Sequence, residues 1–508
     1  MSMHPNPVLP GFYPDPSVCR VGSDYFLVTS TFEYFPGVPI FHSTDLFTWR
    51  QIGHCLTRTS QLDLTGRRSS DGIYAPTLRY HDGVFYMITT DVGGAGHFFV
   101  TAQDPAGPWS DPTYIAGPGF DPDLFFDDDG TVYFSREDIA GHGIRQHVID
   151  ITTGDLLSEE KIIWEGLEDP LCEAPHIYHI GDWYYLLVAE GGTHRGHMVV
   201  IARGTHPTGP FESCPTNPIL THRHRVLADV QAVGHGDLVQ RVDGSWWIVF
   251  LGIRPVGKWH HLGRETFIAP VDWEDGWPRI NRGEAISISP NVSRRVVTPG
   301  FTQEGVLHQE WNTRGFLDST FVQIDGAAQQ IRLVPNGDGL AQTLGSAFLG
   351  HRQTSFRARI SGVFDVSALQ NGEEAGVAAV MNEQHYYTIA CQRRDDQWYV
   401  VVRKQIGATC IVTSEVSLPG QTLTPEESLY LDVSSDPRLF IFAYRYGGGE
   451  RQTLDSGECR YLSTEVAGGF TGVYLGAYAG FYGESSTRSH ETGYALVTQL
   501  TYEDIAEI

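Results

Sequence analysis

The stretch Gly181-Asp-Trp-Tyr-Tyr-Leu-Leu-Val188 places a glycine turn directly before a run of aromatic and branched aliphatic residues. This order is typical of a β-hairpin that leads into a buried strand. The same design occurs five times in the first 300 residues. The five copies cover residues 22–30, 83–90, 130–135, 181–188 and 244–250.

The spacing of these copies predicts the fold. Their first glycines lie 61, 47, 51 and 63 residues apart, which is enough chain for about four short strands in each unit. Four strands are one blade of a β-propeller. Five units fill residues 5–290. Because glycine and proline are frequent and long helical periodicity is absent, we expect an all-β protein whose first domain, residues 1–298, is a five-bladed propeller.

Each copy is preceded by a second repeated element, the opening of a short strand. The openings are Asp15-Pro-Ser-Val, Tyr74-Ala-Pro-Thr-Leu, Asp121-Pro-Asp-Leu, Glu173-Ala-Pro-His-Ile and His235-Gly-Asp-Leu. They stand seven to nine residues before the following glycine, so they occupy one repeated structural position. In a propeller the first strand of each blade lines the central axis. We therefore expect these five side chains to converge at one mouth of the channel.

Three of the five converging residues are acids. Taken singly, an Asp-Pro is usually a turn, and Glu-Ala-Pro is compatible with a simple kink at a strand entry. Taken together, buried carboxylates raise one another's pKa and are costly to keep without a function. Paired carboxylates on an aromatic-rich scaffold indicate glycoside hydrolysis, in which one acid protonates the leaving oxygen and an ionised partner activates water. Acids on opposite sides of an axial pocket suit an inverting mechanism.

Composition excludes several other classes of function. The chain has 508 residues, 41% of them hydrophobic, and a formal net charge of −26. That charge argues against nucleic acid or an anionic membrane as a partner and leaves a homo-oligomer open. No apolar run is long enough to span a bilayer, and residues 1–7 lack the features of a signal peptide. Seven scattered cysteines without a C-x-x-C motif favour free thiols and a cytoplasmic location.

Several ordered motifs resemble glycoside hydrolase family 43, most closely its β-xylosidase and α-L-arabinofuranosidase branch with a C-terminal β-sandwich. They are residues 6–17 (Asn-Pro-Val-Leu-Pro-Gly-Phe-Tyr-Pro-Asp-Pro-Ser), 29–39, 119–130, Glu173-Ala-Pro-His176 and Leu262-Gly-Arg-Glu-Thr266. The resemblance implies inversion and exo attack at a non-reducing end. It also implies that Asp15 is the general base and Glu173 the general acid, with Asp121 raising the pKa of the acid and orienting it.

The resemblance extends to residues that would bind the sugar. Arg264 would bond sugar hydroxyls, with a structural ion pair as the alternative. Phe32 would stack on the sugar, although an ordinary core position is equally compatible with its motif. Tyr74 stands where the xylosidase branch usually has tryptophan, and this difference opens the question of sugar preference.

His235 matches an axial histidine of the family, which implies either a calcium ion in the propeller channel or a hydrogen-bonded channel histidine. One histidine is an unusual ligand for a hard cation, and no cofactor is otherwise expected. Two further histidine groups, His222-Arg-His224 and His260-His261, are interpreted as solvated loops.

Residues 299–508 lose the five-unit pattern and show short alternating runs, which predict a jelly-roll-like β-sandwich. The resemblance implies that this domain lends a loop to the rim of the pocket. Phe481, in Gly476-Ala-Tyr-Ala-Gly-Phe-Tyr-Gly483, is the predicted rim residue.

The sequence thus predicts a glycosidase that releases terminal D-xylose from short oligosaccharides, with L-arabinofuranose as a second sugar. An arabinan- or fructan-directed hydrolase of the same propeller class and a non-catalytic sugar-binding propeller are the alternatives. The three intact acids argue against the last of these.

Overall fold

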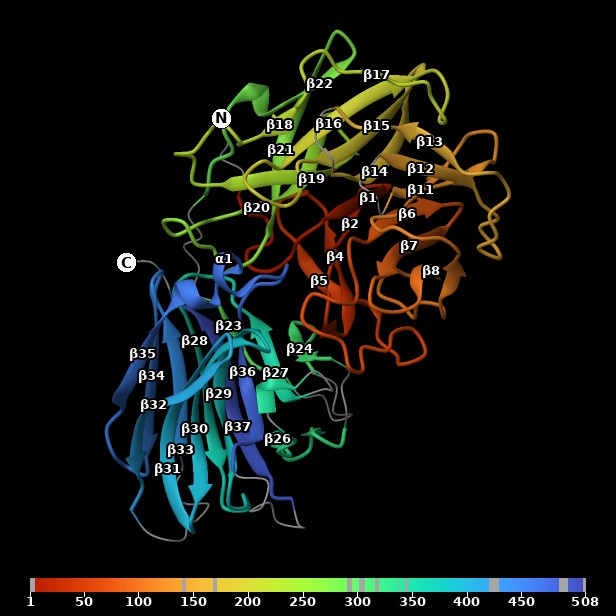
Figure 1. The fold of residues 1–508 in the computed structure, drawn as a ribbon. Helices are drawn as coiled ribbons and strands as arrows, with labels where there is room; N and C mark the ends of the chain where they lie inside the picture. The colour runs from red at the N-terminus through yellow and green to blue at the C-terminus, as the bar shows by residue number, and fades with distance from the viewer. Residues whose placement is uncertain are drawn as a thin grey trace.

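The computed structural model shows two β domains, a propeller that runs from red to green in Figure 1 and a sandwich in green to blue. The residues that the structure describes are 5–138, 143–167, 171–289, 295–300, 307–315, 319–337, 339–342, 346–419, 429–483 and 492–505. No helix in these ranges is long and apolar enough to cross a membrane.

The propeller consists of five antiparallel sheets that follow one another along the chain, as predicted. Blade 1 contains β1 (Ser17–Val21), β2 (Asp24–Val28), β4 (Gly37–Ser43) and β5 (Arg50–Leu56). Blade 2 contains β6 (Thr77–His81), β7 (Val84–Asp91), β8 (Gly96–Ala102) and β9 (Thr113–Ile115). Blade 3 contains β10 (Asp123–Phe126), β11 (Val132–Glu137), β12 (Ile144–Val148) and β13 (Lys161–Trp164).

The last two blades complete the ring. Blade 4 contains β14 (Cys172–Ile180), β15 (Trp183–Glu190), β16 (Met198–Gly204), β17 (Glu212–Ser213) and β18 (Leu220–Thr221). Blade 5 contains β19 (Gln231–Gln240), β20 (Trp246–Ile253), β21 (Glu265–Glu274) and β22 (Trp277–Ile280). The 3₁₀ turn η1 (Asn281–Gly283) follows.

The five repeated glycines form the turn between the first and second strands of each blade. Their φ angles are all positive, between 62° and 88°, and each has open space where a Cβ atom would stand. Backbone conformation rather than crowding therefore requires glycine at these positions. The predicted hairpins are confirmed.

The N-terminal segment closes the ring on blade 5. The backbone N–H groups of Val8 and Leu9 donate to the carbonyl of Thr266 on β21, at 2.9 and 3.2 Å. The amide side chain of Asn6 bonds both backbone groups of Ile268, each at 2.9 Å. Residues from the two ends of the propeller are thereby joined, and this bonding holds Asp15 next to blade 5.

A buried polar network ties four blades together below the channel mouth. Arg79 on β6 donates to Asp123 of blade 3 at 2.7 Å and to Asp237 of blade 5 at 3.2 Å. It also lies 2.9 Å from the Nδ1 atom of His176 of blade 4. Both carboxylates are completely buried. Arg79 therefore neutralises acids that no solvent reaches.

Replacing Arg79 with methionine should destabilise the propeller by about 3–5 kcal/mol, because two buried carboxylates would lose their cation. The measurement is the denaturant midpoint of the full chain. Arg58→Met is the matched control, since Arg58 pairs with the exposed Asp111, and it should move the midpoint little. Equal shifts in the two variants would contradict the role given to Arg79.

The second domain is a two-sheet β-sandwich, which confirms the predicted class. One sheet has the order β25-β26-β37-β28-β33-β34-β35, with β23 beside β37. Its strands are β23 (Val296–Val297), β25 (Val322–Asp325), β26 (Gln330–Leu333), β28 (Ala358–Asp365), β33 (Leu429–Ser435), β34 (Leu439–Tyr446), β35 (Gln452–Glu458) and β37 (Ala495–Asp504). A large apolar cluster that includes Ile360, Val377 and Leu431 fills the space between the sheets.

The other sheet has the order β3-β24-β27-β36-β29-β30-β31-β32. Its strands are β3 (Tyr34–Phe35), β24 (Trp311–Arg314), β27 (Ala347–Arg352), β29 (Glu373–Asn382), β30 (His385–Arg394), β31 (Gln397–Ile406), β32 (Thr409–Ser417) and β36 (Tyr474–Phe481). The short helical elements of this domain are η2 (Gly339–Ala341), η3 (Cys459–Leu462) and α1 (Thr464–Ala467).

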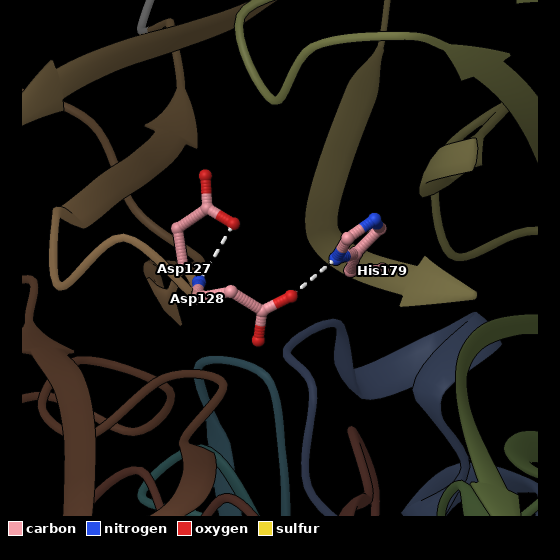
Figure 2. Close-up of side chains that lie close together, drawn as sticks. All are labelled: Asp127, Asp128 and His179. Atoms are coloured by element: carbon pink, nitrogen blue, oxygen red, sulfur yellow. Dashed lines mark hydrogen bonds and ion pairs between the residues drawn. The ribbon is translucent and has the colours of Figure 1, made fainter. Parts of the chain in front are cut away.

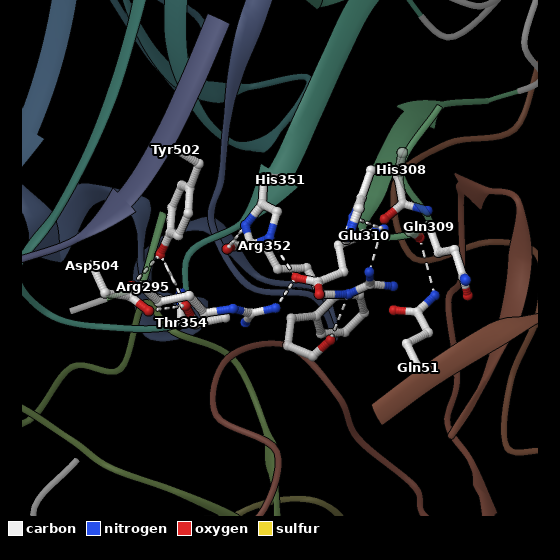
Figure 3. Close-up of polar contacts among 12 residues, drawn as sticks. Gln51, Arg295, His308, Gln309, Glu310, His351, Arg352, Thr354, Tyr502 and Asp504 are labelled. Carbon is white, nitrogen blue, oxygen red and sulfur yellow. Dashed lines mark hydrogen bonds and ion pairs between the residues drawn. The ribbon is translucent and has the colours of Figure 1, made fainter. Parts of the chain in front are cut away.

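The two domains share structure on both sides of the predicted boundary. The propeller segment β3 pairs with β24, and β23, just before residue 298, pairs with β37. Figure 3 shows the polar contacts at this joint, which include Glu310 with His351 and Thr354 with Tyr502 and Asp504.

Candidate active site

A cavity of about 240 Å³ opens where the first strands of the blades begin. Its lining includes seven of the predicted site residues, drawn from all five blades. These are Asp15 and Phe32 (blade 1), Tyr74 (blade 2), Asp121 (blade 3), Glu173 (blade 4), and His235 and Arg264 (blade 5). The structure therefore brings together residues that lie up to 249 positions apart.

The repeated position has a repeated backbone conformation. Asp15, Asp121 and His235 have φ angles of 54°, 50° and 49°, in the left-handed region that non-glycine residues rarely adopt. In blade 4 the residue after the acid, Ala174, has the positive angle, 52°, beside a register shift in the β14–β15 pairing. Strain of this kind clusters at functional sites, where the surrounding structure maintains it.

The carboxyl group of Asp15 accepts three hydrogen bonds. Arg264 donates from Nη1 to Oδ1 at 2.8 Å and from Nη2 to Oδ2 at 3.3 Å. The hydroxyl of Ser30 donates to Oδ2 at 2.6 Å. These bonds fix the orientation of the carboxyl group in the cavity. Arg264 thus forms the ion pair that was the alternative to sugar binding, and its contact with a sugar stays a prediction.

Glu173 and Asp121 lie in the opposite electrostatic situation. Burial and the charge of Asp15 raise the pKa of Glu173 to about 7, against a smaller opposing effect of Arg264. Burial and the charges of Glu173, Asp15 and Glu137 raise the pKa of Asp121 well above its ordinary value. Because these acids interact, their titrations belong to the group. Burial and like-charge repulsion therefore favour the protonated forms of Glu173 and Asp121.

Three aromatic rings form one wall of the cavity. Phe470, from the sandwich domain, stacks on Phe32 with ring centroids 5.8 Å apart and meets Tyr74 edge-on at 5.9 Å. The backbone N–H of Phe470 donates to the hydroxyl of Ser70, and its carbonyl accepts from Arg264. Phe32 is 2% exposed and is both a wall residue and a core residue.

The prediction that Phe481 forms the rim is wrong. Phe481 is a buried residue of β36 whose ring packs against Gly372, and it is not among the residues that line the cavity. Phe470 takes this place, eleven residues earlier. It follows Gly468 and Gly469, whose positive φ angles turn the chain toward the propeller.

Sequence reasoning also missed other residues of the cavity, namely Phe120, Leu171, Thr193, His194 and His197. It missed Glu137, which is 2% exposed and whose pKa is raised to about 8 by burial and by the charge of Glu173. A signal for Glu137 existed in the repeat. Asp91, Glu137 and Glu190 all end the second strand of their blade, and all are buried.

The residues around His235 do not fit a calcium ion. Its Nδ1 atom faces Asp15 Oδ1 at 3.6 Å and Asp121 Oδ2 at 4.0 Å, but Arg264 already occupies the Asp15 carboxylate. Deeper in the channel, Asp123 and Asp237 are bound by Arg79. A hard cation needs several oxygen ligands, and here the carboxylates of Asp15, Asp123 and Asp237 already have an arginine partner, which leaves Asp121 alone to face His235.

Within the described ranges, one group has the spacing of metal ligands, and it lies outside the cavity. Figure 2 shows Asp127 and Asp128 of blade 3 beside His179 of blade 4. His179 Nδ1 lies 2.8 Å from Asp128 Oδ2, and the ring of His179 stacks on Tyr184, whose hydroxyl donates to Asp127. Asp128 is exposed. We interpret this group as a surface ion pair between blades.

The interpretation of the other histidines as solvated is wrong for three of them. His222, His260 and His261 are 2%, 8% and 2% exposed. His222 bonds the carbonyl of Val230, and His260 bonds Glu465 of the sandwich domain. Burial here depends on long-range packing that local sequence does not reveal.

Comparison with known proteins identifies the family of the chain. A family model for glycosyl hydrolases family 43 matches residues 4–278. The chain belongs to glycosyl hydrolase family 43. A second model, for the β-xylosidase C-terminal concanavalin A-like domain, matches residues 300–503, which identifies the type of the sandwich. This family-43 chain is therefore a glycosidase with a five-bladed propeller and a concanavalin A-like sandwich.

Full-length relatives extend the likeness of this family-43 protein. A non-reducing end α-L-arabinofuranosidase of Bacteroides ovatus is 39% identical over 95% of this chain and 92% of its own. A xylosidase/arabinosidase of Butyrivibrio fibrisolvens is 36% identical over 97% and 99%. The crystal structure of a xylan β-1,4-xylosidase from Bacillus halodurans is 32% identical, covers 99% of this chain and 100% of its own, and superposes with a TM-score of 0.88.

Replacing Phe470 with alanine should raise KM about tenfold with a smaller effect on kcat, because one wall of the cavity is lost while the acids stay in place. Steady-state kinetics on a pentoside would measure this. Phe481→Leu is the matched control from the same domain, and it should leave both constants unchanged in the folded protein. A KM effect in Phe481→Leu alone would contradict the assignment.

Proposed function

We propose that this protein is an inverting exo-glycosidase that releases D-xylose, and L-arabinofuranose as a second sugar, from the non-reducing ends of short oligosaccharides. The observation that carries the proposal is the cavity in which Asp15, Asp121 and Glu173 meet beside an aromatic wall. Pocket size supports it, because a cavity of about 240 Å³ with a wall from the second domain suits a terminal sugar better than the middle of a chain.

The electrostatics support the assignment of roles. Asp15, with three hydrogen-bond donors, suits the general base that deprotonates water. Glu173, whose pKa is raised to about 7, suits the general acid that protonates the leaving oxygen. Asp121 lines the same cavity, and burial together with the charges of Glu173 and Asp15 raises its own pKa, so it suits a role in orienting the acid.

In this mechanism the sugar lies between the base and the acid. Water held by Asp15 attacks the anomeric carbon and gives a proton to Asp15. Glu173 gives its proton to the departing oxygen as the glycosidic bond breaks. Attack from the face opposite the leaving group inverts the anomeric configuration. Arg264 holds the carboxyl group of Asp15 in a fixed orientation, which prepares it to accept the proton of water.

The choice of sugar rests on similarity, because relatives named for xylosidase and for arabinofuranosidase activity have comparable identity to this chain. The two pentoses present similar hydroxyl geometry. Tyr74 lines the cavity next to Phe120, and its hydroxyl is a polar group that a tryptophan ring would not supply. This difference keeps an arabinan- or fructan-directed activity as the second candidate.

We further propose a cytoplasmic location and catalysis without a metal ion. The seven cysteines are free, and five of them are buried, which suits a reducing compartment. The proposal of catalysis without a metal ion is supported by the carboxylates near His235 that are already paired with arginine side chains.

A panel of aryl glycosides tests the proposed function. We expect turnover of the β-D-xyloside and the α-L-arabinofuranoside, with little turnover of fructosides. Proton NMR of the first-formed sugar should show the anomer opposite to that of the substrate. Sugar binding without turnover of any glycoside would instead support a non-catalytic propeller, and a retained anomer would rule out the inverting mechanism.

Replacing Glu173 with alanine should separate substrates by leaving group. Hydrolysis of xylobiose should fall by about 10²–10⁴-fold, because its leaving oxygen needs a proton. A dinitrophenyl xyloside should lose much less, whereas Asp15→Ala should lose nearly all activity on both. In the unsubstituted enzyme, activity on xylobiose should decline as pH rises through about 7, because Glu173 then loses its proton. Equal losses on the two substrates in Glu173→Ala would contradict the role of this residue.

A further inference from the structure

One buried histidine beside the acid has a ring nitrogen without a partner. His197 stands directly before β16 and is 1% exposed. Its Nε2 atom faces Glu173 Oε1 at 4.0 Å and has no hydrogen-bond partner among the described residues. An unpartnered polar atom at such depth is costly, so its retention next to a reacting group indicates a function.

The orientation of this imidazole is determined by its surroundings. Its Nδ1 atom lies 3.3 Å from the carbonyl of Ala232, which accepts only an N–H, so Nδ1 carries the proton. The ring rests on Gly234, where a Cβ atom would lie 2.4 Å from three ring atoms. Burial lowers the pKa of His197 to about 3, which keeps the ring neutral. Nε2 therefore presents a bare lone pair toward Glu173.

The carboxyl of Glu173 lacks donors. In contrast with Asp15, no hydrogen bond to it is found from the described part of the chain, and its Oε1 atom faces the lone pair of His197 Nε2 at 4.0 Å. A carboxylate that faces an acceptor is unfavourable, whereas a protonated carboxyl can donate to it. A movement of about 1 Å would bring the two atoms to hydrogen-bond distance.

We propose that His197 is a positioning residue that keeps Glu173 protonated between turnovers by accepting a hydrogen bond from its carboxyl O–H. This inference rests on the proposed function, in which Glu173 is the general acid. When substrate arrives, half a turn about the Cγ–Cδ bond of Glu173 presents the proton to the leaving oxygen. After transfer the carboxylate faces a lone pair and recovers a proton from solvent, while Asp15 releases the proton it took from water.

Other charged groups near Glu173 and His197 also influence the pKa values in this cavity, and these groups are unchanged in the variants described below. Asp15 raises the pKa of Glu173, and Arg264 lowers it. The charge of Glu173 in turn raises the pKa of Asp121 and of Glu137. Burial lowers the pKa of His235 to about 4, and a positive charge on His235 would lower the pKa of His197 further. A substitution at His197 therefore removes one influence on the pKa of Glu173 and leaves the other charged groups in place.

The first test compares pH profiles. In His197→Leu, which removes the acceptor and keeps the site buried, the alkaline limb of kcat/KM on xylobiose should move to lower pH by about one unit, a tenfold loss above the limb. A dinitrophenyl xyloside, which needs no acid, should be affected far less. His222→Leu is the matched control, since His222 is equally buried in the same blade but both of its ring nitrogens are bonded. The alkaline limb of the pH profile of His222→Leu should therefore not move.

The second test needs no change at His197. In protein labelled with ¹⁵N histidine, one neutral Nδ1–H imidazole should show an Nε2 resonance that shifts as Glu173 titrates, and this shift should vanish in Glu173→Ala. An unmoved limb in folded His197→Leu, or the absence of any imidazole that follows Glu173, would overturn the inference. Lack of turnover on every glycoside would instead overturn the proposed function.

Discussion

The ion pair between Arg264 and Asp15 is the interaction on which the site depends. Three acids converge in one cavity, where the charge of Asp15 raises the pKa of Glu173 and the charges of Glu173 and Asp15 raise the pKa of Asp121. Arg264 opposes this effect at Glu173 and Asp121 and binds Asp15 through two bonds. The guanidinium therefore orients the base and, from the same position, limits the rise in the pKa of the acid. Without it, Asp15 would lose two of its three hydrogen bonds.

The same guanidinium links the chemistry to the second domain. Arg264 lies 5.7 Å from the ring centre of Phe32 and 5.6 Å from that of Phe470, and it donates to the carbonyl of Phe470. Ser70 of the propeller holds the N–H of the same residue. Phe470 is thus a sandwich residue whose position is set by propeller groups. This arrangement explains why the sandwich belongs to the cavity and is more than an attached support.

The propeller and its converging acids could be predicted from sequence because both depend on repetition. Turn glycines such as Gly181 recur at blade spacing, and a constant offset places Asp15 and Glu173 at equivalent positions. The rim residue could not be predicted this way. Phe470 and Phe481 stand in similar glycine-rich contexts, and only the packing of two domains decides which one reaches the cavity. His197 escaped notice because its role depends on one unpaired nitrogen, which no motif displays.

Hydrogen-bond donors, rather than residue type, separate the acid from the base in this site. Aspartate and glutamate have similar intrinsic pKa values, so chemistry alone does not tell them apart. Asp15 accepts from Arg264 and Ser30, which stabilises a negative charge. Glu173 accepts no hydrogen bond from the described residues. Its carboxyl group faces the lone pair of His197 Nε2, which makes a negative charge on Glu173 unfavourable. The asymmetry comes from donors of blades 1 and 5 at Asp15 and an acceptor of blade 4 at Glu173, so the closed ring of the propeller is itself what assigns the two roles.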